Sequence, residues 1–400
     1  MQIIEYILKA TEYSLFVYIA MSSIYIFVFA VAGHFYKKRE NDKTNFENKI
    51  AVLIPAYKED VVILEIAKSA LKQNYNPSRY DVVVIADSLK QETIKNLKKL
   101  PIIVVEVSFK NSTKAKALNM AMSKLRNNYD HAVVLDADNI MEADFLKKMN
   151  TAFKSGFQIV QGHRKAKNRN TSYAILDAAS EEINNHIFRK GHNVLGFSSG
   201  LIGSGMGFEY PLFKSIMKSV NAIGGFDKEL EFKFASEHIQ IEYLHDAIVL
   251  DEKIEKLSDF SNQRRRWLST QFVFLRKNFL KGWTELLLKG NVNFFDKVVQ
   301  MIIPPRVLLL GATVLVTLIY VLLEYIMKVS TAIPSVFWML NLGVVIVAFL
   351  LALPKRFYNA NTLKAILSLP SAFFTMFLLL FKMKGANKKF IHTTHGVIQN

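Results

Sequence analysis

Cysteine is absent from the 400 residues of the chain. Its absence excludes a disulfide framework, a thiolate metal site and a catalytic cysteine. Acidic residues are scarce beside basic ones: 34 Asp and Glu stand against 51 Lys and Arg, which gives a formal net charge of +17. An excess of this size predicts anionic partners, which could be nucleic acid, an anionic membrane surface or a phosphorylated substrate.

Long uncharged runs occur near both ends of the chain. Residues 14–36 contain no Asp, Glu, Lys or Arg and precede "KKRE". We therefore expect segment 1–36 to hold a membrane-spanning helix, with the chain from residue 37 onward in the cytoplasm. Residues 301–326 and 334–353 predict two further spans, so that segment 301–353 holds a pair of transmembrane helices.

The remaining C-terminal segments combine apolar and basic residues. Residues 276–300 predict amphipathic helices on the anionic membrane face. Residues 354–400 predict an interfacial or re-entrant helix at 362–381 and then a basic cytoplasmic tail. A third span at 362–381 would place this tail outside, against the positive-inside rule.

Residues 47–275 have the pattern of a soluble α/β domain. Apolar runs such as "IAVLIPAY", "YDVVVIAD" and "HAVVLDAD" alternate with helix-like segments such as "VVILEIAKSALKQ". This alternation predicts a mixed, mostly parallel sheet covered by helices. Such sheets bind ligands at the carboxyl ends of their strands, where Tyr57, Asp87, Asp136 and Asp138 are expected.

Several short motifs suit an anionic ligand and a cation. Asp136 and Asp138 in "VVLDADN" offer carboxylate oxygens to Mg²⁺ or Mn²⁺, which often complete their shell with substrate phosphates; an ordinary acidic turn is the alternative. Lys114 in "STKAKALN" opens a helix and could bind an anion or lie on a solvated face. The run "SSGLIGSGMGF" holds four glycines, which permit close approach of backbone to a ligand.

Three consecutive arginines precede a tryptophan in "NQRRRWLS", residues 262–269. Arginine forks bind phosphate, and a tryptophan ring supports a sugar or a cation. A basic juxtamembrane patch held by anionic lipid is the alternative reading.

The segments "PAYKED", "IADS", "KAKALN", "DAD", "GSGM", "KELE" and "QRRRW" resemble, in order and approximate spacing, membrane-bound family 2 glycosyltransferases. That group includes cellulose, hyaluronan and poly-N-acetylglucosamine synthases and bacterial exopolysaccharide transferases. The resemblance covers about residues 50–270 and implies a GT-A fold, a Rossmann-like mixed sheet. It further implies inverting, metal-dependent transfer from a nucleotide sugar, expected to be UDP-linked, to a growing polysaccharide or glycan. The protein would be a multi-pass plasma-membrane enzyme with a cytoplasmic catalytic domain.

The resemblance also implies roles for individual residues. The residues expected at the nucleotide sugar are Tyr57, Glu59, Asp87, Lys114 and Asp136. The ligands expected for Mg²⁺ or Mn²⁺ are Asp138 and Asp136. The residues expected at the acceptor or the diphosphate are Gly203, Ser204, Gly205, Met206, Gln263, Arg266 and Trp267. One departure is Ala115, which stands where the family pattern has Gly and makes the backbone fit beside the donor less certain.

The family's general base, usually an Asp in a T-E-D-x-x-L pattern, has no identical counterpart in this chain. Aligning "KELEFKF" with that pattern places Glu229 at the base position. Asp227 in the "GGFD" turn is the second candidate, and Glu237 is the third. A shifted pairing of "SEH" would instead place His238 there.

Two alternative functions stay open from the sequence. One is non-processive transfer of a single sugar to a polyprenyl-linked lipid acceptor, and the other is a membrane transporter or export component. The predicted spans lack the paired broken helices and buried charges typical of transporters. Nucleic acid is not expected as a partner, because the basic residues cluster beside the membrane segments. The expected partners are a nucleotide sugar, a glycan or lipid-linked acceptor and membrane lipids; a second copy of the chain or an export protein could join them.

Overall fold

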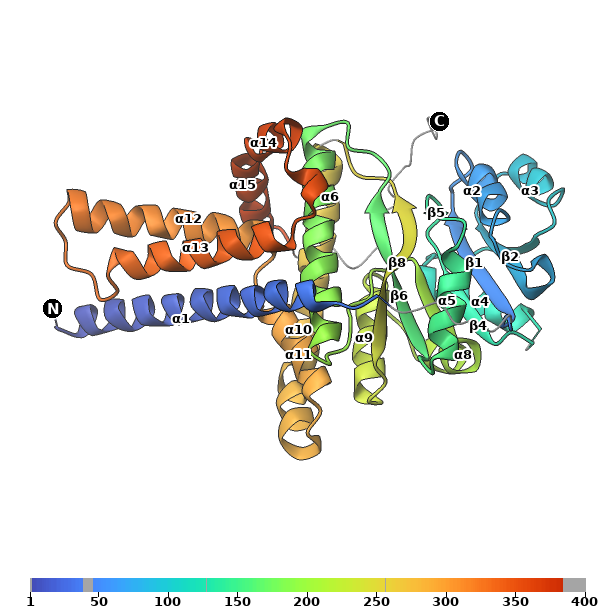
Figure 1. Ribbon diagram of the computed structural model, residues 1–400, viewed down its shortest axis with the longest axis horizontal. Helices are drawn as coiled ribbons and strands as arrows, with labels where there is room; N and C mark the ends of the chain where they lie inside the picture. The colour runs from blue at the N-terminus through green and yellow to red at the C-terminus, as the bar shows by residue number, and fades with distance from the viewer. Residues whose placement is uncertain (1, 39–45, 127, 256, 384–400) are drawn as a thin grey trace.

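The computed structural model describes residues 2–38, 46–126, 128–255 and 257–383. Figure 1 shows a sheet-containing domain at one end and a group of long helices at the other, with further helices between them. Residues 384–400 of the predicted basic tail lie outside the described residues, so the tail stays a prediction.

Eight strands form one mixed sheet in the order β3-β2-β1-β4-β7-β6-β8-β5. The strands are β1 Ile50–Tyr57, β2 Tyr80–Asp87, β3 Ile103–Val107, β4 His131–Val134, β5 Ile140–Met141, β6 Ile159–Ala166, β7 Met206–Glu209 and β8 Ile241–Asp251. The pairs β1–β2, β1–β4, β2–β3 and β6–β8 are parallel, and β4–β7, β6–β7 and β5–β8 are antiparallel. The prediction of a mixed, mostly parallel sheet is confirmed.

Strand β1 shows why this segment is a buried strand. Successive side chains point to opposite faces of a sheet. Ile50, Val52 and Ile54 accordingly join one hydrophobic core, and Ala51 and Leu53 join the core on the other face. Both faces are therefore covered, as is usual where parallel strands carry continuous apolar runs.

Helices cover the two faces of the sheet. The helices on the first core are α2 Ile63–Ala70, α3 Gln91–Leu97 and α5 Phe145–Lys154. The helices on the second core are α4 Lys114–Lys124, α8 Tyr210–Met217 and α9 Phe226–Ser236. Helix α9 carries the acids considered as bases, so its position decides which of them reaches the carboxyl ends of the strands.

Among the residues that the structure describes, three helices are long and apolar enough to cross a membrane, and they cover Ile3–Phe35, Arg306–Ile326 and Ser335–Ala352. They correspond to α1 (Gln2–Ala32), α12 (Arg306–Val321) and α13 (Ser335–Ala352), which pack together at one end of the molecule (Figure 1). Helices α14 (Ala360–Ile366) and α15 (Leu369–Leu380) meet at an angle of 42°. A bent pair suits either a broken span or a re-entrant segment, so the predicted course of residues 362–381 stays a prediction.

Two expected helix boundaries differ from the structure. Helix α1 begins at Gln2 rather than near residue 14, and its first turns carry a Lys9–Glu5 ion pair of 2.8 Å with helical spacing. Helix α12 begins at Arg306 rather than at residue 301, because Pro304 and Pro305 lack the N–H groups that a helix interior requires.

The helices between the two ends are α6 Ser172–Asn184, the π-helical turn η3 Asn185–Gly191, α7 His192–Val194, α10 Leu257–Lys289 and α11 Val292–Ile302. Helix α10 is continuous over 33 residues and runs through the expected domain boundary at residue 275. It ends beside Gly290, whose φ is +62°. A single rigid helix therefore joins the arginine-rich motif to the segment expected at the membrane surface.

Gly225 lets α9 begin close to α10. Its φ is +73°, and a Cβ there would lie 2.3 Å from Cγ2 of Thr270 on α10. We expect Gly225→Ala to lower the melting temperature by several degrees, because it combines left-handed backbone strain with a steric clash. Gly196→Ala is the matched control: its φ is +80° and no heavy atom lies within 4 Å of the added Cβ. Equal losses for the two variants in thermal unfolding would contradict the close approach of α9 and α10.

Candidate active site

One cavity of about 950 Å³ collects most of the polar residues that the sequence predicts at the site. Its walls are the carboxyl ends of β1, β2 and β4, the first turns of α4 and α9, and part of α10. A volume of this size is typical of ligand pockets.

The end of β1 and the end of β2 form the first wall. Tyr57 and Asp87 are partners in the parallel register, and both line the cavity together with Glu59. Asp87 is buried, and one of its carboxylate oxygens accepts a hydrogen bond of 3.0 Å from Ser88 Oγ. The three residues predicted for the nucleotide therefore lie together at one edge of the sheet.

Lys114 connects this wall to the end of β4. The α4 N-cap, Thr113, accepts a 3.2 Å hydrogen bond from the backbone N–H of Lys116, so the helix begins at Lys114. Lys114 Nζ pairs with the carboxylate of Asp136 and donates a 2.7 Å hydrogen bond to the carbonyl oxygen of Gly203. A cationic group thus lies beside the strand-end acids, where an anionic ligand would need it.

Asp136 and Asp138 both line the cavity. Asp138 is 6% exposed, and its Oδ1 accepts a 3.1 Å hydrogen bond from Asn139 Nδ2, which also donates to Asp251 Oδ1 at 3.0 Å. Within the described ranges no group of three or more His, Asp or Glu side chains could hold a metal ion. A cation bound by the two carboxylates would need oxygen ligands from a phosphate and water, and this donor set suits Mg²⁺ or Mn²⁺.

The predicted acceptor segment 203–206 lines the cavity only in part. Gly203 lies on the cavity wall, whereas Ser204, Gly205 and Met206 lie behind it. Ser204 Oγ accepts a 2.9 Å hydrogen bond from the Asp136 backbone N–H, and Met206 belongs to the hydrophobic core at the start of β7. The prediction for these three residues needs correction, because none of them lines the cavity: Ser204 bonds the backbone beside Asp136, Met206 packs in the core, and Gly205 has no side chain to offer.

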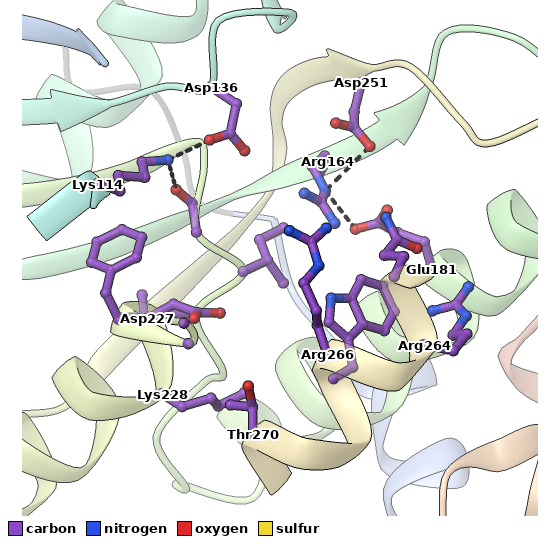
Figure 2. Close-up of a pocket in the computed structure, with 18 of the residues that line it drawn as sticks. Lys114, Asp136, Arg164, Glu181, Asp227, Lys228, Asp251, Arg264, Arg266 and Thr270 are labelled. Atoms are coloured by element: carbon purple, nitrogen blue, oxygen red, sulfur yellow. Dashed lines mark hydrogen bonds and ion pairs between the residues drawn. The ribbon is translucent and has the colours of Figure 1, made fainter. Parts of the chain in front are cut away.

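Asp227 lies in the first turn of α9 and lines the cavity. Figure 2 shows its side chain pointing inward, with Lys114 and Asp136 on one wall and Arg266 on another. Burial raises the pKa of the Asp227 carboxyl, Glu231 raises it further, and the ammonium groups of Lys228 and Lys114 oppose the shift. A carboxylate of raised basicity inside a cavity has the properties of a general base.

Glu229, the first choice from the sequence, does not line the cavity. Its Oε2 accepts hydrogen bonds from the backbone N–H groups of Asn221, at 3.1 Å, and Ala222, at 2.8 Å. Glu237 and His238 are exposed at the end of α9 and do not line the cavity either. The geometry therefore favours Asp227, and the Glu229 side chain stabilises the turn before α9.

The arginine-rich motif lies in the first half of α10. Gln263, Arg266 and Trp267 all line the cavity, and Trp267 is 45% exposed. Burial lowers the pKa of the Arg266 guanidinium. The neighbouring Arg264 pairs with Asp177 and lies 4.2 Å from the centroid of the Trp267 ring. Arg264 thereby holds one face of the tryptophan, which is a cation–π contact.

A buried charge cluster on the cavity wall was not predicted from the sequence. Arg164 Nε lies 2.8 Å from Glu181 Oε1 and 3.7 Å from Asp251 Oδ2, and Lys253 Nζ lies 2.6 Å from Asp251 Oδ2 (Figure 2 shows the first three residues). Asp251 ends β8 as Asp87 ends β2, so its position at a strand end could have identified Asp251 as a candidate site residue. Lys253 follows Asp251 by two residues, but Arg164 on β6 and Glu181 on α6 come from distant segments, so their pairing leaves no local pattern.

Solved structures are similar to this chain, and one of them, with a TM-score above 0.5, shares its fold. A mannosyltransferase from Pyrobaculum calidifontis, solved in complex with GDP-Man and Mn²⁺, is 14% identical with a TM-score of 0.55, over 86% of this chain and 98% of that one. S. aureus TarS is 15% identical with a TM-score of 0.37, over 54% of this chain and 38% of that one. Its residues 1–349, solved with UDP, give 16% identity and a TM-score of 0.37, over 55% and 64%.

No curated protein matches the chain. Residues 48–270 match the family described as "Glycosyltransferase like family 2", and this match covers more than half of the chain. The match favours an enzyme over the transport or export component that the sequence left open. The chain therefore belongs to glycosyltransferase like family 2 and is a glycosyltransferase with a GT-A-like fold.

Proposed function

We propose that this glycosyltransferase moves a sugar from a nucleotide sugar, expected to be UDP-linked, to a hydroxyl group of a glycan acceptor with inversion at the anomeric carbon. One observation carries the proposal: Asp136 and Asp138 line the same cavity as Asp227, Arg266 and Trp267. A cation site, a base, a guanidinium and an aromatic platform are the groups that this reaction requires.

The donor would be bound along the first wall of the cavity. Tyr57, Glu59 and Asp87 would hold the nucleoside, and Lys114 and Arg266 would balance the charge of the diphosphate. Asp136 and Asp138 would hold Mg²⁺ or Mn²⁺, which stabilises negative charge on a departing diphosphate when bound. The solved relative with GDP-Man and Mn²⁺ supports a divalent cation in this family's fold.

Asp227 would act as the general base. As the acceptor oxygen forms its bond to the anomeric carbon, its proton passes to the Asp227 carboxylate. The bond between the anomeric carbon and the diphosphate oxygen breaks with its electron pair, and a nucleoside diphosphate leaves. A single displacement of this kind inverts the anomeric centre. Trp267, held by Arg264, would support the ring of the acceptor sugar.

The reaction would take place at the cytoplasmic face of the plasma membrane. Three helices apolar enough to span a bilayer and a formal net charge of +17 support this location. The second half of α10 adds exposed Leu280, Leu287 and Leu288 beside lysines, which suits a helix lying in the membrane surface.

The pH dependence of transfer should report the raised pKa of Asp227. A base acts only when deprotonated, so kcat/KM should fall as pH drops through that raised pKa. The midpoint of the acid limb of the kcat/KM profile should therefore lie above pH 3.8, which is the ordinary pKa of Asp. Asp227→Glu should shift this limb. A profile for the wild type that stays flat down to pH 4 would count against Asp227 as the base.

A screen of nucleotide sugars with the purified full chain tests the proposed function. The protein would be incubated with UDP- and GDP-sugars and Mg²⁺ or Mn²⁺, and release of nucleoside diphosphate would be followed with and without glycan acceptors. We expect release from one donor class and faster release with an acceptor. No release from any donor would overturn the proposal.

A further inference from the structure

The cavity extends beyond the catalytic residues to the base of the membrane helices. Its far end is lined by the loop before α12, by the first turn of α12 and by α15. The residues concerned are Ile303, Pro304, Pro305, Arg306, Val307 and Met376. Helix α12 is one of the three candidate spans, so one continuous cavity joins the sugar-transfer site to the membrane-facing part of the chain.

Arg306 gives this far end a cationic group without a carboxylate partner. Its Nη2 donates a 2.8 Å hydrogen bond to Ser180 Oγ, and its buried Nε has no hydrogen-bond partner. No carboxylate of the described residues lies within 4.0 Å of its guanidinium. Arg306 therefore lines the cavity with a guanidinium that has no carboxylate partner, which fits a ligand that brings its own negative charge.

Buried Arg189 lines the same cavity and is also not neutralised by a neighbour. Its Nε donates to the carbonyl oxygen of Gly200 at 3.1 Å, and its Nη1 donates to Asn185 Oδ1 at 2.9 Å. Both acceptors are uncharged. Two guanidinium groups without an ion-pair partner among the described residues therefore line one cavity, and a phosphate or diphosphate would balance their charge.

The apolar residues of the far end suit a hydrocarbon chain better than a row of sugars. Ile303, Val307 and Met376 are aliphatic or thioether side chains, and the two prolines beside them add apolar rings. Sugar rings bind preferentially against flat aromatic faces, and none of the six far-end residues is aromatic. Trp267, the platform proposed for the acceptor sugar, lines the same cavity but is not one of these six residues.

We infer that the acceptor is a lipid-linked sugar whose phosphate or diphosphate is bound by Arg306 at the membrane-side end of the cavity. The inference rests on the proposed function. The sugar lies against Trp267 with its hydroxyl toward Asp227, the phosphate lies between Arg306 and Arg189, and the hydrocarbon chain passes along α12 and α15. The acceptor sugar thereby receives the transferred residue while its lipid stays in the membrane.

Direct binding to the full chain in detergent tests this inference. The probes are farnesyl diphosphate, farnesol and inorganic pyrophosphate, each titrated with UDP and Mn²⁺ present to fill the donor site. We expect farnesyl diphosphate to bind at least tenfold more tightly than either partial probe. Arg306→Gln should weaken its binding about tenfold, which is the loss expected for one charge-assisted hydrogen bond. Arg306→Lys should retain part of the affinity.

Arg79→Gln is the matched control, because Arg79 is exposed and lies outside the cavity. It should bind farnesyl diphosphate as the wild type does. Equal affinity in Arg306→Gln and wild type would overturn the inference, as would equal binding of farnesol. Displacement of farnesyl diphosphate when UDP is added to a sample prepared without it would overturn the inference and assign Arg306 to the donor instead.

Two measurements keep the outcomes separate. UDP release from UDP-sugars, measured on the same protein preparation without added UDP, tests the proposed function without reference to the lipid. A wild type that releases UDP but does not bind farnesyl diphosphate contradicts the lipid inference alone, and a wild type that releases no nucleoside diphosphate contradicts the proposed function. If Arg306→Gln does not fold, the order of the wild-type affinities for the three probes still tests whether the cavity binds a lipid diphosphate.

Discussion

Asp227→Asn is expected to lower kcat for sugar transfer by about 100- to 10,000-fold, the range for loss of a general base. Asn cannot accept the proton of the acceptor hydroxyl, although it preserves the size of the side chain. Asp227 lines the cavity beside Arg266, whereas the nucleoside wall is built by other residues. The Kd for the nucleotide should therefore stay within about twofold of wild type. Single-turnover kinetics and nucleotide titration measure the two quantities separately.

Glu229→Gln is the matched control for this variant, since it makes the same chemical change two residues away. Glu229 does not line the cavity and its Oε2 accepts hydrogen bonds from two backbone N–H groups, so its loss of charge should lower the melting temperature and leave kcat within a few fold of wild type. The opposite ranking, with transfer lost in Glu229→Gln and retained in Asp227→Asn, would restore the sequence-based choice of Glu229.

Removal of the divalent cation is expected to slow transfer by about a thousandfold. A bound cation stabilises the negative charge that develops on the leaving diphosphate, which lowers the energy of the transition state by several kcal/mol. Asp138→Asn should produce a similar loss and raise the Mn²⁺ concentration needed for half-maximal rate. Asp138 is buried on the cavity wall, and within the described ranges no third acidic or histidine side chain completes a metal site with it and Asp136. Titration of Mn²⁺ and Mg²⁺ after chelation measures both effects.

Asp144→Asn controls for the loss of one acidic charge. Asp144 is exposed beside α5, accepts a 2.9 Å hydrogen bond from Asn74 Nδ2, and does not line the cavity. Its metal titration should match that of the wild type. Full activity of the wild type after exhaustive chelation would show that the chain transfers sugar without a divalent cation.

The sheet could be predicted from the sequence because its strands are buried on both faces. β1 and β2 occupy the residues of the predicted runs "IAVLIPAY" and "YDVVVIAD", since short apolar runs rich in β-branched residues favour buried strands. The strand-end residues Tyr57, Asp87 and Asp136 reach one cavity for the same reason, because parallel strands end at one edge.

The base could not be chosen from the sequence because the choice depends on the phase of a helix. Asp227 and Glu229 are two residues apart, and on an α-helix two residues turn the side chain by about 200°. Only the start of α9 at Phe226, fixed by the left-handed Gly225, brings Asp227 to the cavity and turns Glu229 toward Asn221. A single sequence does not give the first residue of this helix, so it does not show which acid of the run faces the cavity.

Contacts between distant segments also could not be predicted from the sequence. Arg306 was expected inside a membrane span, and nothing near it in the chain indicates that it meets Ser180 on α6. The four glycine-rich residues 203–206 illustrate the converse. Their composition indicates close backbone approach, but it does not say that Gly203 alone faces the cavity.

The anomeric configuration of the product tests the central claim most directly. Wild-type protein would be given an α-linked nucleotide sugar that it accepts, and the new glycosidic bond would be assigned by NMR while released nucleoside diphosphate is counted. Single displacement with Asp227 as base predicts a β-linked product and one nucleoside diphosphate for each bond formed. An α-linked product would contradict it.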